Sequence, residues 1–389
     1  MAAVFCCEGK RDQESLRQLH IRQREAGEER RKRCRPPPGL DGPFLHGIMN
    51  SGEYAGDNIE RRLAMDYTKI PGTDLTVSRA CLGTMTFGDQ MDETTARSAV
   101  ALGVERGVNF VDTADIYPRV SPTATEEILG KVLKPWRQKI VLATKAGGAT
   151  GPGPDDRGLG RTHLLAAAEA SLRRLQTDCI DLYYAHFPDK NVSPEALIEA
   201  MNDLIQEGKI RYYGISNFSA WQICEMILKA REMGLQPPVA TENVYNLLTR
   251  GIETELLPLL GKYPMGLTTY NPLAGGLLSG KYQAGRRPAD GRLSLDKGYA
   301  DRYLSDRNLE AVERIQALAE QRGQTVLGLS LQWLWAQPKV TSVILGFSRI
   351  GQLEQNLDLL ENAPAVPLPE EELGNIWRDL TGNRFPTHK

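Results

Sequence analysis

A regular alternation of short apolar runs with longer amphipathic segments is the feature that most limits how this chain can fold. The apolar runs are rich in β-branched and aromatic residues, which is typical of strands, and they occupy 78–83, 109–114, 140–145, 179–186, 210–216, 239–245, 265–270 and 341–346. Apolar residues at helical spacing occupy 93–107, 125–133, 161–175, 193–209, 220–232, 252–260, 308–323, 326–337 and 350–360. Strands that alternate with helices predict a parallel sheet, and about eight such units favour a closed (β/α)8 TIM barrel.

The alternation begins only after residue 64, which divides the chain into two parts. Residues 1–64 include the charge-rich stretch Lys10–Arg35, followed by "PPPG", and this composition predicts a disordered extension. Residues 65–389 are expected to form one barrel domain, and Met65 is an alternative start of the chain. No G-x-G-x-x-G pattern follows the first expected strand, which argues against a Rossmann fold.

Composition narrows the classes of function. The net charge of -2 gives no sign of a nucleic-acid partner. No run of about 18 apolar residues is present, so no membrane span is expected. The six cysteines are scattered without metal-like pairing, which predicts no metal site and favours a reducing, cytoplasmic location with free thiols.

Polar side chains stand where several expected strands end, and in a barrel the chemistry lies at that face. Asp112 and Tyr117 follow the second strand, Lys145 ends the third, and His186 ends the fourth. Asp112 would keep Lys145 charged, and the charge of Lys145 would lower the pKa of Tyr117. A phenol tuned in this way can serve as a general acid, while His186 can orient a substrate oxygen. The four residues suit protonation of an oxygen while its carbon accepts a hydride.

Several stretches resemble the aldo-keto reductases, in the same order along residues 65–361. They are "DTADIY", "LATK", "DLYYAHFPD", "GISNF", "YNPLAGGLLSGKY" and "ILGFSRIGQLEQNL". The resemblance implies a (β/α)8 barrel that reduces aldehydes and ketones with NADPH. It also implies that Tyr117 is the general acid, that Asp112 and Lys145 tune it, and that His186 orients the substrate.

The same resemblance implies a binding site for the cofactor, NADPH or NADP+. Ser216 and Asn217 would hold the carboxamide, and Tyr270 would stack on the nicotinamide ring. A helix N-terminus after the last strand would favour phosphate, and Arg292 and Arg349 are candidates to bind the 2′-phosphate. Further residues implied in contact with the cofactor are Glu242, Asn271, Pro272, Leu273, Ala274, Gly275, Ser279, Lys281, Gly346, Ser348, Gln352 and Asn356.

Two positions depart from the family pattern. Glu242 stands where the family usually has glutamine, so a carboxyl group replaces the amide that helps to hold the nicotinamide. The substitution changes the local charge, and with it the affinity and the balance between oxidised and reduced cofactor. Pro118 follows Tyr117 where many members have glycine, and the segment "PRVSPTAT" resembles a bacterial branch with a longer loop.

Two other functions compete with carbonyl reduction. "RGLGRTHL" also resembles the β subunits of voltage-gated potassium channels, which share the barrel and bind the same cofactor, so a regulatory binding subunit is the main alternative. Those subunits lack a histidine at the position of His186. A Schiff-base aldolase or a sugar-phosphate isomerase would use Lys145, but such a lysine requires a neutral amine, and Asp112 would keep it protonated.

The remaining features carry less functional information. The expected partner is a small-molecule carbonyl compound, and an oligomer is compatible with the sequence. Loops 147–160 and 283–306 are expected to cover the active site. Loop 283–306, the segment after Tyr117 and the tail 373–389 are expected to determine the substrate. Trp333 and Trp335 are expected to serve packing, and His163 to lie at the surface or cap a helix. Cys81, Cys179 and Cys224 are expected to be inert core residues.

Overall fold

Eight parallel strands close into a barrel in the computed structural model, which describes residues 65–153, 156–282, 288–289, 291–362 and 367–380. Each strand pairs with its neighbours along the chain, and the last strand pairs with the first of the eight. The strands are β3 (Ala80–Gly83), β4 (Phe110–Asp112), β5 (Val141–Ala146), β6 (Ile180–Ala185), β7 (Ile210–Ser216), β8 (Ala240–Val244), β9 (Gly266–Tyr270) and β10 (Ser342–Gly346). The expectation of a (β/α)8 barrel is confirmed, whereas the predicted disordered extension lies outside the described residues.

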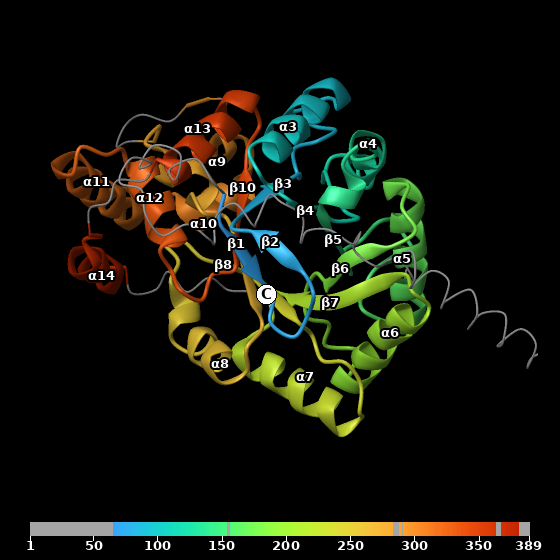
Figure 1. The fold of residues 1–389 in the computed structure, drawn as a ribbon. Helices are drawn as coiled ribbons and strands as arrows, with labels where there is room; N and C mark the ends of the chain where they lie inside the picture. Colours follow the sequence, from blue (N-terminus) through green and yellow to red (C-terminus); the bar gives the residue numbers. More distant parts are fainter. Residues whose placement is uncertain (1–64, 154–155, 283–287, 290, 363–366, 381–389) are drawn as a thin grey trace, which may run out of the picture.

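Helices surround the barrel, as Figure 1 shows. The longer ones are α3 (Glu93–Glu105), α4 (Ala124–Val132), α5 (Arg161–Leu175), α6 (Pro194–Gln206), α7 (Ala220–Glu232), α8 (Leu256–Lys262), α11 (Asp306–Gln321), α12 (Val326–Trp335), α13 (Ile350–Glu361) and α14 (Glu370–Asp379). Short helical segments are η2 (Arg137–Lys139), η4 (Gly251–Glu253), η5 (Ala274–Ser279), α9 (Arg292–Leu295) and α10 (Lys297–Tyr303). Within the described ranges, no helix combines the length and apolar character needed to cross a bilayer.

Local sequence explains where several of these helices begin. The side chains of Asp92, Ser193, Ser305 and Thr325 each accept a hydrogen bond from a backbone N–H in the first helical turn. Such caps satisfy amide groups that have no partner within the helix. Pro194 occupies the first turn of α6, where its missing N–H costs nothing. These helices therefore begin close to the positions that the sequence predicts.

An antiparallel hairpin precedes the barrel and was not predicted. It consists of β1 (Tyr67–Lys69) and β2 (Thr76–Ser78), and the sequence pattern had joined Ser78 to the first barrel strand. The Asn109 side chain holds β2 in place, because it accepts a hydrogen bond from Ser78 N at 2.6 Å and donates one to Thr76 O at 2.9 Å.

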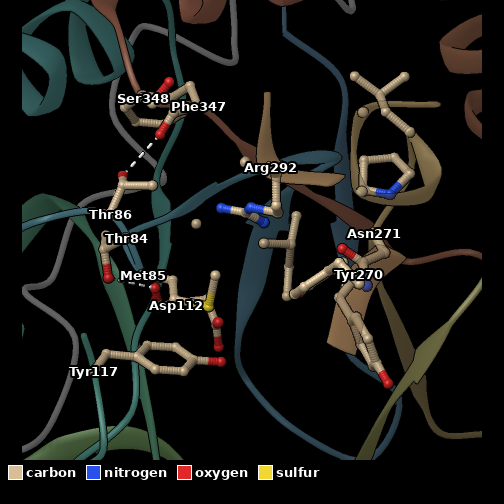
Figure 2. A pocket seen from close by; sticks show the side chains of 18 of the residues that line it. Thr84, Met85, Thr86, Asp112, Tyr117, Tyr270, Asn271, Arg292, Phe347 and Ser348 are labelled. Atoms are coloured by element: carbon tan, nitrogen blue, oxygen red, sulfur yellow. Dashed lines mark hydrogen bonds between the residues drawn. The ribbon is translucent and has the colours of Figure 1, made fainter. Parts of the chain in front are cut away.

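The hairpin supplies apolar side chains to the interior of the barrel. Ile70, Leu75 and Val77 are buried in one cluster with residues of the strands, such as Phe110 and Tyr184. Figure 1 shows β1 and β2 across one end of the barrel. Side chains such as Asp112, Tyr117 and Tyr270 belong to the other end, where the strands finish, and they are drawn in Figure 2. The hairpin thus fills one end of the barrel, and the polar residues at the strand ends remain at the other.

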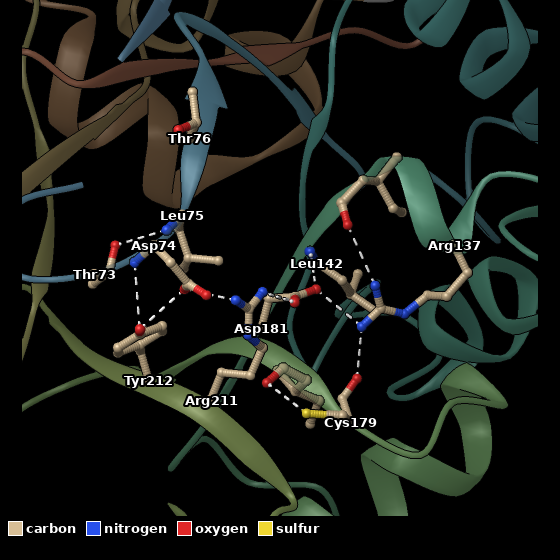
Figure 3. Close-up of polar contacts among 12 residues, drawn as sticks. Thr73, Asp74, Leu75, Thr76, Arg137, Leu142, Cys179, Asp181, Arg211 and Tyr212 are labelled. Atoms are coloured by element: carbon tan, nitrogen blue, oxygen red, sulfur yellow. Dashed lines mark hydrogen bonds and ion pairs between the residues drawn. The ribbon is translucent and has the colours of Figure 1, made fainter. Parts of the chain in front are cut away.

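A network of ion pairs ties the hairpin to the starts of three strands (Figure 3). Asp181 on β6 is buried, and its two carboxylate oxygens contact Arg137 at 2.9 Å and Arg211 at 2.8 Å. The other end of the Arg211 guanidinium reaches Asp74 in the hairpin turn at 2.6 Å, and Tyr212 donates to the same oxygen of Asp74 at 3.0 Å. This network is far from the strand ends that carry the predicted chemistry, so its role is structural.

Replacing Asp181 with alanine is expected to lower the free energy of unfolding by about 3–5 kcal/mol, because two partly buried arginines lose their shared partner. Urea unfolding would measure the change. Asp203→Ala is a suitable control, because it breaks an exposed pair with Arg161 and exposed pairs contribute little. Equal effects of the two substitutions would contradict the structural role of Asp181.

Several smaller expectations are tested by the fold. Trp333 is fully buried against Tyr245, with ring centroids 5.0 Å apart, as expected for a packing role. His163 was expected at the surface or as a cap, and this was wrong: it lies in the first turn of α5 and is buried. Cys81 and Cys224 are free thiols, as expected.

Candidate active site

A cavity of about 470 Å³ opens where the barrel strands end. Most of the residues proposed from the sequence line it, and Figure 2 shows ten of its side chains by name. The predicted residues on its wall are Asp112, Tyr117, His186, Ser216, Asn217, Glu242, Tyr270, Asn271, Pro272, Leu273, Gly275, Ser279, Lys281, Arg292, Gly346, Ser348, Gln352 and Asn356. Lys145, Ala274 and Arg349 were predicted in the site and do not line this cavity.

Lys145 lies directly behind the wall, within a cluster of three ionisable groups. Its side chain is fully buried, and its Nζ donates to Asp112 Oδ1 at 2.6 Å and to Thr113 O at 2.9 Å. Glu242 Oε2 lies 3.4 Å from the same nitrogen. The pKa of Lys145 is raised because the nearby carboxylates of Asp112 and Glu242 outweigh the effect of burial. The ammonium therefore stays charged at neutral pH, as the sequence predicted.

Tyr117 stands next to this cluster, with Lys145 Nζ 5.6 Å from the centre of its ring. Its pKa was expected to fall, and this expectation was wrong. Burial raises the pKa of Tyr117 above its ordinary value, and Asp112 and Glu242 raise it further, although Lys145 acts in the opposite direction. The desolvation of a buried phenolate outweighs one favourable charge. The phenol therefore holds its proton at neutral pH, as a general acid must before it acts.

His186 follows β6 and faces Tyr117 edge-on, with ring centroids 5.9 Å apart. Its imidazole also stacks on Phe187 at 4.2 Å. Burial, and then the positive charges of Lys145 and Arg119, hold the pKa of His186 well below its usual range. The ring is therefore neutral at pH 7, and one of its nitrogens carries a hydrogen that can be donated.

Hydrogen bonds connect the ends of β6, β7, β8 and β9 around the cavity. Tyr270 donates to Asn217 Oδ1 at 2.6 Å, and Asn217 Nδ2 donates to the backbone oxygen of His186 at 3.0 Å. Ser216 Oγ donates to the backbone oxygen of Glu242 at 3.1 Å. Asn217 adopts a φ of 66°, an uncommon conformation that the surrounding bonds stabilise. These bonds fix the side chains of Ser216, Asn217 and Tyr270, which are expected to face the nicotinamide ring.

The loop after β9 forms a compact turn that presents its backbone to the cavity. Asn271 and Ala274 have positive φ values of 54° and 50°, and Gly275 and Gly276 continue with 67° and 100°. A Cβ on Gly275 would lie 2.9 Å from a ring carbon of Tyr299, so the position favours glycine on steric grounds as well. Ala274 is fully buried and does not line the cavity.

Cationic side chains enter the cavity from the helices after this loop. Arg292 lies between the Tyr270–Asn271 side and the Thr86–Ser348 side of the cavity (Figure 2). Arg292 and Arg302 both lie against the ring of Tyr299, at 5.2 and 5.4 Å from its centre, and all three residues line the cavity. Arg349 was expected to act with Arg292. It is exposed at the start of α13 and lies off the cavity wall.

The far end of the cavity lies between β10 and α13. Gln352 Oε1 accepts a hydrogen bond from Ser348 N at 2.8 Å, and Asn356 lies one turn further along the helix. Thr86, in the loop after β3, donates to Phe347 O at 2.7 Å and closes this end. The loop after β10 is therefore bonded both to α13 and to the loop after β3.

The shape and chemistry of the cavity fit a dinucleotide. Asn271 Nδ2 is buried without a hydrogen-bond partner among the described residues, so a donor is available on the wall. Gly275 and Gly276 have no side chain, so a phosphate group could approach the backbone of this turn closely. Lys281 and Arg292 supply positive charge that would bind such a group. No group of three or more potential metal ligands of the His, Cys, Asp and Glu types occurs among the residues described.

Part of the wall was not predicted from the sequence. Ile116, Arg119 and Phe187 surround Tyr117 and His186, and the loop that begins at Gly83 lines the other side. The remaining additions are Thr84, Met85, Thr86, Gln90, Gly276, Tyr299, Arg302, Leu327, Ile344, Phe347 and Gln355. Most have no charge pattern or motif that could mark them. The exceptions are Arg119, in the segment after Tyr117, and Tyr299 and Arg302, in loop 283–306, because the sequence predicted that both of these segments shape the substrate site.

Comparisons with known proteins agree with this architecture. The model of the aldo/keto reductase family matches residues 79–376. The chain is 38% identical over 309 residues to a protein of Arabidopsis thaliana named "Probable voltage-gated potassium channel subunit beta", covering 78% of this chain and 93% of the relative. A protein of the same name from Oryza sativa subsp. japonica is 36% identical with the same coverage.

A third relative carries the name of an enzyme. It is "Aflatoxin B1 aldehyde reductase member 2" from Rattus norvegicus, which is 33% identical over 350 residues, covering 83% of this chain and 92% of the relative. The family match spans most of the barrel, and each of the three relatives is covered over more than nine-tenths of its length. The chain belongs to the aldo/keto reductase family.

Proposed function

We propose that this chain is a reductase that converts aldehydes or ketones to alcohols with NADPH. The observation that carries the proposal is the convergence of four residues from three successive strands: Asp112, Tyr117 and His186 line one wall of the cavity, and Lys145 lies directly behind it. A buried charged pair next to a protonated phenol and a neutral imidazole is difficult to explain by packing alone. Such an arrangement suits proton donation to a carbonyl oxygen.

Each of these residues has a defined role in the proposed reaction. NADPH supplies the hydride when bound, while the protein supplies orientation and charge. Tyr117 donates its proton to the oxygen, and Lys145 stabilises the phenolate that remains. Asp112 keeps Lys145 charged and in position through the bond at 2.6 Å. His186 donates a hydrogen bond to the substrate oxygen, so that the carbonyl carbon faces the nicotinamide.

We assign the nicotinamide to the wall made by Ser216, Asn217, Glu242 and Tyr270. The turn that follows Tyr270 would hold the pyrophosphate, and the residues between β10 and α13 would hold the adenosine end. Lys281 and Arg292 favour NADPH over NADH, because both are cations on the cavity wall. Arg349 has no part in this assignment because it lies off the wall.

Arg292→Met is expected to raise the Kd for NADPH about tenfold and to leave the Kd for NADH nearly unchanged, because only NADPH carries the 2′-phosphate. Calorimetric titration with both cofactors would measure the two constants. Arg349→Met is the matched control and should leave both constants near their wild-type values. A similar loss for NADH in the Arg292 variant would place this side chain elsewhere on the cofactor.

The assay that tests the proposed function follows the loss of NADPH absorbance in the presence of a panel of aldehydes, including 4-nitrobenzaldehyde. Turnover is expected with NADPH. Tight binding of NADPH without turnover of any carbonyl compound would overturn the reductase proposal and support a regulatory role.

A regulatory, cofactor-binding subunit is the second candidate, because two relatives are named as probable potassium channel β subunits. A complete set of Asp112, Tyr117, Lys145 and His186 favours turnover, since the resembling channel subunits lack a histidine at the position of His186. A Schiff-base reaction at Lys145 is disfavoured, because the neighbouring carboxylates raise the pKa of its amine and keep it protonated. Borohydride trapping with a keto substrate should therefore give no adduct.

A further inference from the structure

A third ionisable group belongs to the catalytic cluster and has no role in the reaction as proposed. Glu242 on β8 is almost fully buried, and its Oε2 lies 3.4 Å from Lys145 Nζ, whereas Asp112 Oδ1 lies at 2.6 Å. The aldo-keto reductases usually have an uncharged glutamine at this position. In this chain, Glu242 places a second carboxyl group beside the single ammonium of Lys145. Glu242 also lines the cavity, between the Ser216–Asn217 wall and Tyr270.

The charges in this cluster cannot all be present at neutral pH without cost. Two carboxylates and one ammonium would leave a net negative charge in a buried site, which is unfavourable in a low dielectric. Asp112 accepts hydrogen bonds from Lys145 through both of its oxygens, so it is the better partner for the ammonium. Glu242 Oε2 makes only the longer contact with Lys145, and the hydrogen bond between the carboxyl groups of Glu242 and Asp112 requires a proton on one of them. The proton therefore resides on Glu242.

The pKa of Glu242 agrees with this distribution. Burial, and then the charge of Asp112, raise it to about 8, and the opposing effect of Lys145 is smaller. A protonated carboxyl group offers one hydrogen-bond donor and one carbonyl acceptor, much as the amide of glutamine does. Below about pH 8, Glu242 can therefore replace glutamine at the carboxamide without adding charge to the site.

We propose that the protonation state of Glu242 determines which redox form of the cofactor binds more tightly. When Glu242 is neutral, the site accepts both forms of the nicotinamide, and when Glu242 is ionised, the site favours the oxidised form. The reason is electrostatic, because the oxidised ring carries a positive charge that the reduced ring lacks. Conversely, binding of NADP+ should expel the proton from Glu242, and binding of NADPH should not. This inference rests on the proposed function, since it requires the cavity to bind NADP(H) with its ring beside Glu242.

The other titratable groups that face Glu242 keep their charge state over the relevant pH range. Those on the surrounding strands and the adjoining loops are Asp112, Lys145, Cys81, Tyr117, Tyr184 and Tyr270. Burial raises the pKa of the thiol and of the three phenols, so they stay neutral. Lys145 stays charged. His186 stays neutral because its pKa is lowered. Burial also raises the pKa of Asp112, so the pH dependence belongs to the Asp112–Glu242 pair, and the closer contact of Asp112 with Lys145 assigns the titrating proton to Glu242.

Calorimetric titration of the full-length protein with NADP+ and with NADPH, from about pH 6 to about pH 9.5, tests the inference. The ratio Kd(NADPH)/Kd(NADP+) should rise about tenfold or more with pH, in a transition centred near the pKa of Glu242. Taking the ratio cancels the titration of the 2′-phosphate, which both forms share. In Glu242→Gln the ratio should be constant across the same range, and Glu199→Gln, an exposed carboxyl on α6, should behave as wild type.

Repeating the titrations in buffers of different ionisation enthalpy gives a second readout, the number of protons released. Near pH 7.5 the wild-type protein should release up to about one proton more with NADP+ than with NADPH, and this difference again cancels the titration of the 2′-phosphate. A ratio that does not change with pH in the wild type would overturn the inference, and so would an unchanged transition in Glu242→Gln. Failure of both cofactors to bind at any pH would instead overturn the proposed function, and the inference with it.

Discussion

Tyr117→Phe is expected to reduce kcat by about 10³-fold while NADPH binding is retained. The substitution removes only the phenolic oxygen, so the apolar packing of the ring beside His186 is kept. It also removes the proton donor, and general acid catalysis contributes about 10²–10⁴-fold in such reactions. Steady-state kinetics would measure kcat, and a fluorescence titration would measure the Kd for NADPH.

Tyr263→Phe provides the control for this experiment. Tyr263 is half-buried next to α8 and outside the cavity, so the same loss of a hydroxyl group should leave both kcat and the Kd unchanged. Unchanged turnover in Tyr117→Phe would remove Tyr117 from the role of general acid. A loss of NADPH binding equal to the loss of kcat would show that the tyrosine acts through the cofactor site instead.

Lys145→Met is expected to abolish turnover and to destabilise the fold. The ammonium is fully buried between Asp112 and Glu242, so its removal leaves two carboxyl groups without a cation. Loss of one partner from a buried ion pair costs about 3–5 kcal/mol. Urea unfolding at neutral pH would measure the free energy, and NADPH consumption would measure turnover.

The stability of this variant should also depend on pH in a defined direction. Without Lys145, the folded-state pKa values of Asp112 and Glu242 lie above those of the unfolded chain, because burial opposes their ionisation. Folding then becomes less favourable as pH rises through the unfolded-state values, so part of the lost stability should return in mild acid. Lys134→Met, an exposed substitution, should show no such recovery. A pH dependence like that of the wild type would contradict a shared charge in the cluster.

The sequence predicted the barrel because its information is local and repeated. A strand of about six apolar residues followed by an amphipathic helix has a pattern that can be recognised in each unit. The hairpin was missed because its two strands have only three residues each, too short for a recognisable period. Ser78 was assigned to the first barrel strand for the same reason, whereas its pairing with Tyr67 and a bend at Arg79 separate it from Ala80.

The candidate site could be predicted in part, because parallel strands bring their ends to one face whatever the details of packing. Asp112, Tyr117 and His186 are on the cavity wall for this reason, and Lys145 lies directly behind it. The loop after β3 was not predicted, because its residues on the cavity wall bear no charge and form no motif. Arg349 was placed on the wall from its position in a motif, but the direction of its side chain depends on how α13 packs.

The sequence by itself therefore determined the order of the strands and the identity of the groups at their ends, since both follow from local pattern and from chain connectivity. Only the tertiary structure decided the charge state of those groups. Tyr117 shows the difference: a neighbouring lysine suggested a lowered pKa, whereas burial raises it. Glu242 is a second case, because its protonation state depends on the distance of 3.4 Å between its Oε2 and Lys145 Nζ, which lie on different strands. Desolvation and distance depend on all surrounding elements at once, and no single stretch of sequence contains them.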